Sequence, residues 1–166
     1  EIVKFLIGRG TDINAECPFF GDALQISIRE TDKEMINLLL DSGANINAHR
    51  PGVCCTALQT AASIPPLPGV ISVLELLLDR GADINAIGGN RGTALATAAR
   101  LGINGEEHVR ILLRRGAFAN LHGGPQARYV TPLHAAIVCR LGPPGSGAGY
   151  GHEPVVRMLV DAGARV

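Results

Sequence analysis

The chain has 166 residues, of which 46% are hydrophobic and 4% aromatic, and its formal net charge is +0. This length suits one compact domain or one short repeat array with an aliphatic core. The balanced charge gives no sign of a nucleic-acid partner, and no apolar run approaches the ~18 residues of a membrane span. The cysteines show no disulfide framework spacing, so we predict reduced thiols in an intracellular, cytoplasmic protein: Cys17, Cys54, Cys55 and Cys139.

Charge is divided unevenly along the chain. Residues 1–87 carry 6 Lys and Arg against 11 Asp and Glu, whereas residues 88–166 carry 9 against 4. One interpretation is a drift of surface charge with no function. The other is a gradient that orients a partner.

A recurring apolar stretch followed by glycine organises the chain. In the copy at residues 73–86, Leu77 and Leu78 lie near the end of an apolar helix, and Gly81 follows where a helix ends in a left-handed residue. Asparagine follows four positions after the first four such glycines. The glycines are Gly10, Gly43, Gly81, Gly116 and Gly163, and the asparagines are Asn14, Asn47, Asn85 and Asn120. This internal repeat predicts a stack of small units.

The first part of the chain predicts a lone helix and then a helix pair. Residues 1–7 match the second helix of the later copies, and residues 11–21 are predicted to form a turn and an extended finger. Residues 22–30 predict a short first helix with Asp22 as its N-cap, because a carboxylate there accepts a free backbone N–H. Residues 33–40 predict the second helix of this pair.

Threonines begin the later units. Each of Thr56, Thr93 and Thr131 is predicted to cap a first helix, and Pro132 stands at the first helical position, where its missing N–H costs nothing. The loops between paired helices are predicted to contain the helix breakers and the extra length. These breakers lie at residues 65–68, 104–105 and 142–151.

Several of these motifs together resemble the ankyrin repeat. They are Thr131-Pro132-Leu133-His134, the alanines that follow it, Leu77-Leu78 before Gly81-Ala82, and Asp83-Ile84-Asn85-Ala86. The resemblance implies an all-α, ankyrin-type solenoid of stacked helix pairs with hairpin-like fingers. Glycine pairs at residues 88–89 and 123–124, with Ala-Leu-Gln at residues 23–25 and 57–59, resemble the large ankyrin arrays of filamentous fungi.

We expect a single array that is an excerpt of a longer one. Its predicted parts are a partial repeat at residues 1–21, full repeats at residues 22–55, 56–92 and 93–130, and a last repeat at residues 131–166 with a long loop at residues 141–153. The chain departs from the family pattern after the first helix, where only Gly102 keeps the expected glycine. Thr31, Pro65 and Arg140 stand at the matching places.

No motif for catalysis is present, so we expect no enzyme activity, no cofactor and no small-molecule substrate. His134 and Cys139 are close enough in sequence to suggest a thiol–imidazole pair. The resemblance implies instead that this histidine bonds to an adjacent turn. His49 with Cys54 and Cys55 raises the possibility of a metal site, but adjacent cysteines rarely both bind one tetrahedral ion, and we expect none.

The resemblance implies a module that binds a protein partner on a concave face made by finger tips and first helices. Carried over to this chain, the partner-binding residues are Glu16, Phe19, Phe20, Arg29, Arg50, Asn90, Arg91, Arg100, Arg128 and Tyr129. Aromatic fingers would act as anchors and arginines would meet carboxylate or phosphate groups. The alternatives are that Phe19 and Phe20 pack their own finger and that the arginines form a solvated face. An alternative function is a structural spacer or an intramolecular regulatory lid on other domains of the same polypeptide.

Overall fold

The fold is known from a computed structural model that describes residues 2–15, 21–49, 56–125, 127–128, 131–138 and 153–165. Over these ranges the chain is helical, with isolated β-bridges but no extended strand. The α-helices are α1 (Ile2–Gly8), α2 (Ala23–Arg29), α3 (Lys33–Asp41), α4 (Ala57–Ala62), α5 (Val70–Asp79), α6 (Ala94–Ala99), α7 (Glu106–Arg114), α8 (Pro132–Val138) and α9 (Glu153–Asp161). Two short 3-10 helices, η1 (Gly89–Arg91) and η2 (Gly102–Gly105), precede α6 and α7.

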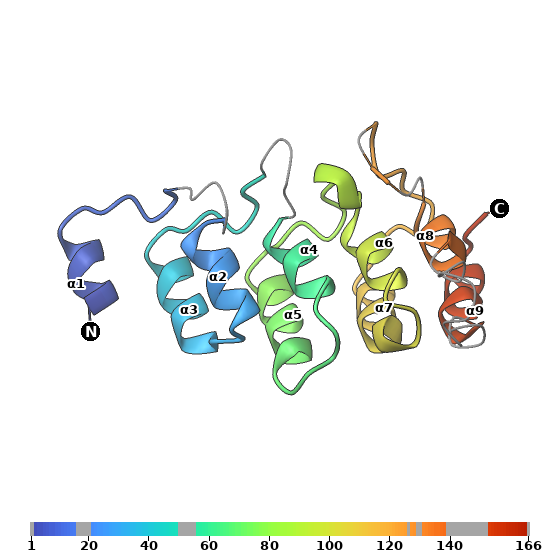
Figure 1. The fold of residues 1–166 in the computed structure, drawn as a ribbon, viewed down its shortest axis with the longest axis horizontal. Helices are drawn as coiled ribbons and strands as arrows, with labels where there is room; N and C mark the ends of the chain where they lie inside the picture. The colour runs from blue at the N-terminus through green and yellow to red at the C-terminus, as the bar shows by residue number, and fades with distance from the viewer. Residues whose placement is uncertain are drawn as a thin grey trace, which may run out of the picture.

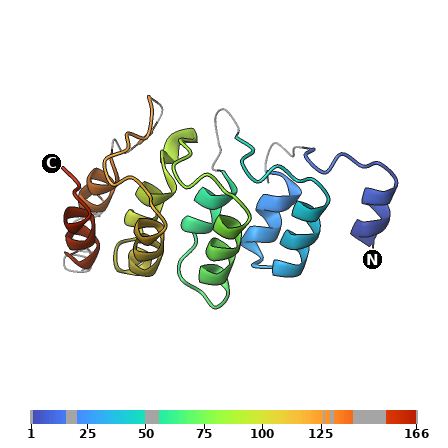
Figure 2. The same cartoon turned by 180° about the vertical axis from the view of Figure 1, so that it is seen from behind.

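The helices form a row of antiparallel pairs with α1 alone at one end (Figure 1). Within the row, α2, α4, α6 and α8 contact one another in that order, and α5, α7 and α9 do the same. The connecting fingers project from one side of the row in both views (Figure 2). The predicted all-α solenoid is therefore confirmed.

Side-chain caps begin the first helices, as the sequence predicts. The Asp22 carboxylate accepts the backbone N–H of Gln25 at 2.7 Å. Thr56 and Gln59 form a reciprocal capping box at the start of α4, and Thr93 accepts the N–H of Ala96 at 3.1 Å. Each cap satisfies a helix-end donor that has no partner within the helix.

Left-handed glycines end the second helices. The predicted stop glycines have φ angles between 82° and 95°: Gly10, Gly43, Gly81, Gly116 and Gly163. After the first helix of its pair, Gly102 has φ 60°, and Thr31 takes the same conformation with φ 56°. A β-branched residue is strained there, and among the described residues Thr31 is the one non-glycine residue with a positive φ.

The core lies between the two layers of helices. Leu39, Leu77, Leu112 and Leu159 occupy equivalent positions in α3, α5, α7 and α9, and each is at most 2% exposed. The equivalent Leu6 of α1 is 45% exposed, because the described chain places no first helix beside α1. Neighbouring pairs therefore provide the burial that a single pair of this length lacks.

The repeated asparagines join successive units. The amide of Asn47 donates to the Gly81 carbonyl at 3.3 Å, and its oxygen accepts the Asp83 N–H at 2.8 Å. Asn14, Asn85 and Asn120 make the same two bonds to the following unit. Each asparagine thus satisfies two backbone groups in the neighbouring turn.

One predicted connection takes a regular form. Residues 104–105, predicted as helix breakers between paired helices, complete the 3-10 turn η2, which leads directly into α7. A Cβ on Gly105 would lie 2.0 Å from the Ala98 carbonyl oxygen, so the glycine is required for close approach to α6. The predicted long loop lies outside the described residues up to residue 152, and α9 begins at Glu153.

Candidate protein-binding surface

The finger before α6 is a compact hairpin built from glycine. The backbones of Gly88 and Gly92 pair in both directions, at 2.8 and 3.1 Å, around the 3-10 turn η1. Gln59 of α4, which is 0% exposed, donates through Nε2 to the carbonyls of Ala86 and Gly92, at 3.2 and 2.6 Å. The Gln59 side chain of the preceding repeat therefore fixes the two ends of this finger.

The next finger stacks against it at close range. A Cβ on Gly92, where φ is 78°, would lie 2.9 Å from the Gly123 Cα, so only glycine permits this spacing. The backbone N–H of Arg128 donates to the Asn90 carbonyl at 2.9 Å. These contacts place η1 beside the finger that precedes α8.

Four predicted partner-binding residues meet where these fingers stack. Asn90 and Arg91 belong to η1, Arg100 follows the last residue of α6, and Arg128 belongs to the next finger. Together they line a hollow of about 160 Å³, which we call the arginine hollow. Arg91 and Arg100 are half-buried, and Arg128 and Asn90 are exposed.

The three cations of the arginine hollow have no acidic partner among the described residues. By contrast, four arginines in or directly after the second helices are paired: Arg80 with Asp41 at 2.7 Å, Arg115 with Asp79, Arg110 with Glu106 and Glu107, and Arg157 with Glu153. Arg114, the last residue of α7, is exposed and has no ion pair among the described residues, but it stands alone. Positive charges gathered without counter-ions favour an anionic group at the same place. The arrangement can bind an anion through planar guanidinium donors.

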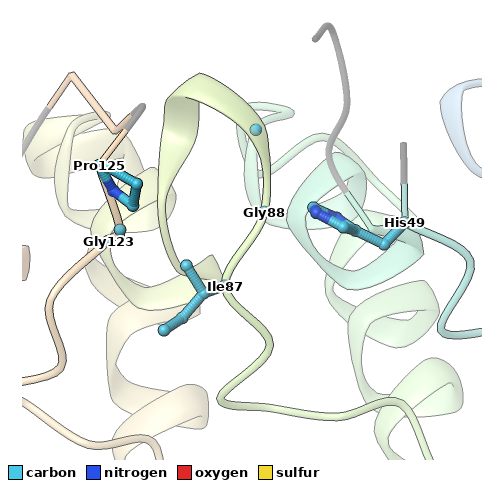
Figure 3. A pocket seen from close by; sticks show the side chains of 7 residues that line it. His49, Ile87, Gly88, Gly123 and Pro125 are labelled. Carbon is cyan, nitrogen blue, oxygen red and sulfur yellow. The ribbon is translucent and has the colours of Figure 1, made fainter. Parts of the chain in front are cut away.

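A second hollow lies between the same fingers and the preceding one (Figure 3). It measures about 270 Å³ and is lined by His49, Ile87, Gly88, Gly89, Gly123, Gly124 and Pro125. A Cβ on Gly88 would lie 2.9 Å from Nδ1 of His49, so the glycine lets the imidazole approach the finger backbone. From the sequence, His49 was considered only as a possible metal ligand, and the glycine pairs at residues 88–89 and 123–124 were noted as a family feature and not as the lining of a hollow.

The remaining predicted binding residues are not brought to the arginine hollow. Arg29 is the last residue of α2, in a different repeat, and is exposed with an interaction of its own. Glu16, Phe19, Phe20, Arg50 and Tyr129 lie outside the described residues. Their roles stay predictions.

No group of three metal-binding side chains comes together in the described part of the chain. Cys54, Cys55 and Cys139 lie outside that part, so the expected absence of a metal and of a thiol–imidazole pair stays a prediction. The backbone N–H of His134 donates to Thr131 Oγ1 at 3.1 Å, which confirms Thr131 as a helix cap. No helix in the described ranges combines the length and apolar character needed to cross a bilayer.

Sequence reasoning missed one buried titratable residue. His108 of α7 is 0% exposed, and neither Nδ1 nor Nε2 has a hydrogen-bond partner. Burial lowers the pKa of this imidazole, and the nearby Glu107 carboxylate opposes the shift. The equivalent positions, eight residues before the stop glycine, are occupied by Met35, Val73 and Val155. These apolar residues are the sequence signal that could have identified position 108 as part of the core.

Stacked helix pairs, left-handed stop glycines and fingers along one side define a helical repeat protein. The ankyrin repeat family, in three copies, matches residues 1–87. The chain belongs to this family, and the predicted resemblance is confirmed. Ankyrin repeats are generally protein–protein interaction modules.

Several curated proteins are similar to this chain. Ankyrin repeat and SOCS box protein 6 of Homo sapiens is 32% identical over 117 residues, which cover 68% of this chain and 27% of that protein. Ankyrin repeat and KH domain-containing protein mask of Drosophila melanogaster is 40% identical over 97 residues, 57% of this chain and 2% of that protein. The chain thus spans about a quarter or less of these relatives. Both are animal proteins, so the resemblance to fungal arrays stays a prediction.

Proposed function

We propose that this chain is a non-catalytic module that binds a protein partner through its finger tips and first helices, centred on the arginine hollow. The observation that carries the proposal is the gathering of Arg91, Arg100 and Arg128 around one hollow without an acidic partner in the described chain. An interface of this kind uses charge complementarity to select and orient its partner.

Membership of a family of interaction modules supports the proposal, but it does not by itself choose a surface, because one repeat scaffold presents many surfaces. The contrast in charge pairing favours this one. Arginine is also enriched where binding energy concentrates in protein interfaces. The neighbouring hollow beside His49 and Ile87 extends the same surface across one further finger.

The test is affinity capture with four baits of this chain from a lysate of its source cells. The first is unchanged, the second carries Arg91→Glu, Arg100→Glu and Arg128→Glu, and the third carries Arg114→Glu. Arg114 is exposed at the end of α7 and forms no ion pair among the described residues, so it controls for charge reversal at one position. The fourth bait carries Arg114→Glu, Arg157→Glu and Arg165→Glu, so that its change in charge equals that of the hollow variant.

We expect proteins captured by the unchanged bait and by both control baits to be absent from the triple hollow variant. High salt should weaken this capture, because exposed charge interactions are screened beyond roughly 10 Å at 0.1 M salt. Equal capture by all folded baits would contradict the arginine hollow as the binding site. No specific capture by the folded chain would favour the spacer or intramolecular lid, and a lid should instead bind other domains of its own polypeptide in trans.

A further inference from the structure

We propose that the arginine hollow binds the phosphoryl group of a phosphoserine or phosphothreonine in the partner protein. The inference rests on the proposed function and names the chemical group that this surface recognises. It is argued from the size of the hollow, its charge and its rigidity.

The size of the hollow fits one functional group. Pockets for drug-sized ligands measure roughly 300 to 1,000 Å³, whereas this hollow measures about 160 Å³. Its lining is Asn90, Arg91, Arg100 and Arg128, with no apolar side chain among them. A hollow of this size and polarity accommodates the charged end of one side chain and excludes a large apolar ligand.

The number of charges distinguishes phosphate from carboxylate. Three arginines line the hollow, and none has an acidic partner in the described chain. A carboxylate has one negative charge and two acceptor oxygens, whereas a phosphorylated side chain has about −1.5 to −2 charges and three acceptor oxygens. Guanidinium groups donate pairs of hydrogen bonds to phosphate oxygens, and a cluster of them is a recurring way to recognise phosphorylated segments.

The backbone that carries these side chains is held before any ligand binds. Gln59 bonds to both ends of the first finger, at Ala86 and Gly92, and the Asn90 carbonyl accepts the N–H of Arg128 in the next finger. Arg100 follows directly on helix α6. These hydrogen bonds order the backbone at Asn90, Arg91 and Arg128 before binding, which lowers the entropic cost of binding.

The experiment uses this chain with three fluorescent pools of degenerate peptides that differ only at a central residue: phosphoserine, serine or glutamate. Fluorescence anisotropy gives the Kd of each pool at low and high salt. The variants are Arg91→Gln, Arg100→Gln and Arg128→Gln, singly and together, with Arg114→Gln as the matched control. A thermal melt by circular dichroism shows that each variant is folded.

We expect the phosphoserine pool to bind about tenfold or more tightly than the glutamate and serine pools, since a phosphoryl group has a larger negative charge and one more acceptor oxygen than a carboxylate. Each hollow variant should weaken that binding by about tenfold, the triple variant should abolish it, and Arg114→Gln should leave it unchanged. Inorganic phosphate in excess should compete.

Equal binding of the phosphoserine and glutamate pools would overturn the phosphoryl assignment and indicate an acidic peptide. Failure of all three pools would also overturn it. In either case the proposed function stands if lysate capture still depends on the three arginines, so the two failures are distinguishable. Unchanged phosphoserine binding by a folded triple variant would overturn the hollow as the site.

Discussion

Two groups of arginines, one at the second helices and one at the fingers, differ in their ion pairing. On the second helices, Arg80 and Arg115 each reach back to an aspartate of the preceding unit, Asp41 and Asp79. On the side of the fingers, the arginines of the arginine hollow are left without counter-ions in the described chain. Arg80 and Arg115 thus join neighbouring units, whereas Arg91, Arg100 and Arg128 make no ion pair within the described chain. Unpaired charge on a folded surface is available to a partner.

The largest expected effect is a loss of stability that disturbs both the helix layers and the fingers. Leu77→Ala in α5 removes a side chain that is 0% exposed in the shared core. We expect the free energy of unfolding to fall by about 2 to 5 kcal/mol, measured by urea denaturation, because the substitution leaves a cavity. The control Leu77→Met should cost less than about 1.5 kcal/mol. A loss below that of the control would show that α5 is not a central layer of the stack.

A second substitution should disrupt the stacking of the fingers and leave the helix layers intact. Gly92→Ala adds a Cβ 2.9 Å from the Gly123 Cα, so the two fingers must separate and the arginine hollow should widen. We expect a loss of about 1 to 3 kcal/mol in the free energy of unfolding and weaker binding of the phosphoserine peptide pool. Gly116→Ala is the matched control, because Gly116 also has a positive φ but has nothing within 4 Å of its added Cβ. Equal effects of the two substitutions would contradict the close stacking of the fingers.

A change in the helix layer should alter the dependence of stability on pH and leave the hollow unaffected. The folded state lowers the pKa of His108, so the unfolded chain takes up a proton first. The contribution of His108 to the free energy of unfolding is fully present above the unfolded pKa, about 6.5. It is lost as the pH falls toward the folded pKa, by at most about 1.4 kcal/mol per pH unit.

His108→Val introduces the residue found at the equivalent positions, Val73 and Val155. We expect it to raise the free energy of unfolding by about 1 to 3 kcal/mol at neutral pH, because it removes buried polar atoms without partners. Urea denaturation at pH 7.5, 6 and 5 should show a gain that grows as the pH falls. A gain that is constant with pH would mean that His108 does not titrate on unfolding.

The smallest expected effects come from replacing one paired arginine and one arginine of the arginine hollow. Arg115→Ala removes an exposed ion pair and should lower the free energy of unfolding by about 0.2 to 1 kcal/mol without changing peptide binding. Arg100→Ala should change stability by less than about 0.5 kcal/mol but weaken the binding of the phosphoserine pool. Thermal melts and anisotropy on both variants check this. A reversal of the two outcomes would remove the distinction between the two sides.

Sequence alone determined the repeat and most of its local structure. Asp22, Thr56 and Thr93 were predicted as caps and act as caps, because capping depends on a side chain and a backbone N–H only three residues apart. The stop glycines likewise take left-handed angles that a local rule predicts. The sequence showed Thr31 at a glycine position but not its left-handed conformation, which runs against the local preference of a β-branched residue at the junction between α2 and α3.

Only the tertiary structure decided which side chains meet. Asn90, Arg91, Arg100 and Arg128 were four of ten residues predicted to bind a partner, and the structure brings these four around one hollow while Arg29 lies in another repeat. That grouping depends on the stacking of Gly92 against Gly123, which are 31 positions apart in sequence. The pairing of Arg115 with Asp79 also arises between units. Local rules describe one repeat, whereas contacts between repeats require the distances that only the stacked chain provides.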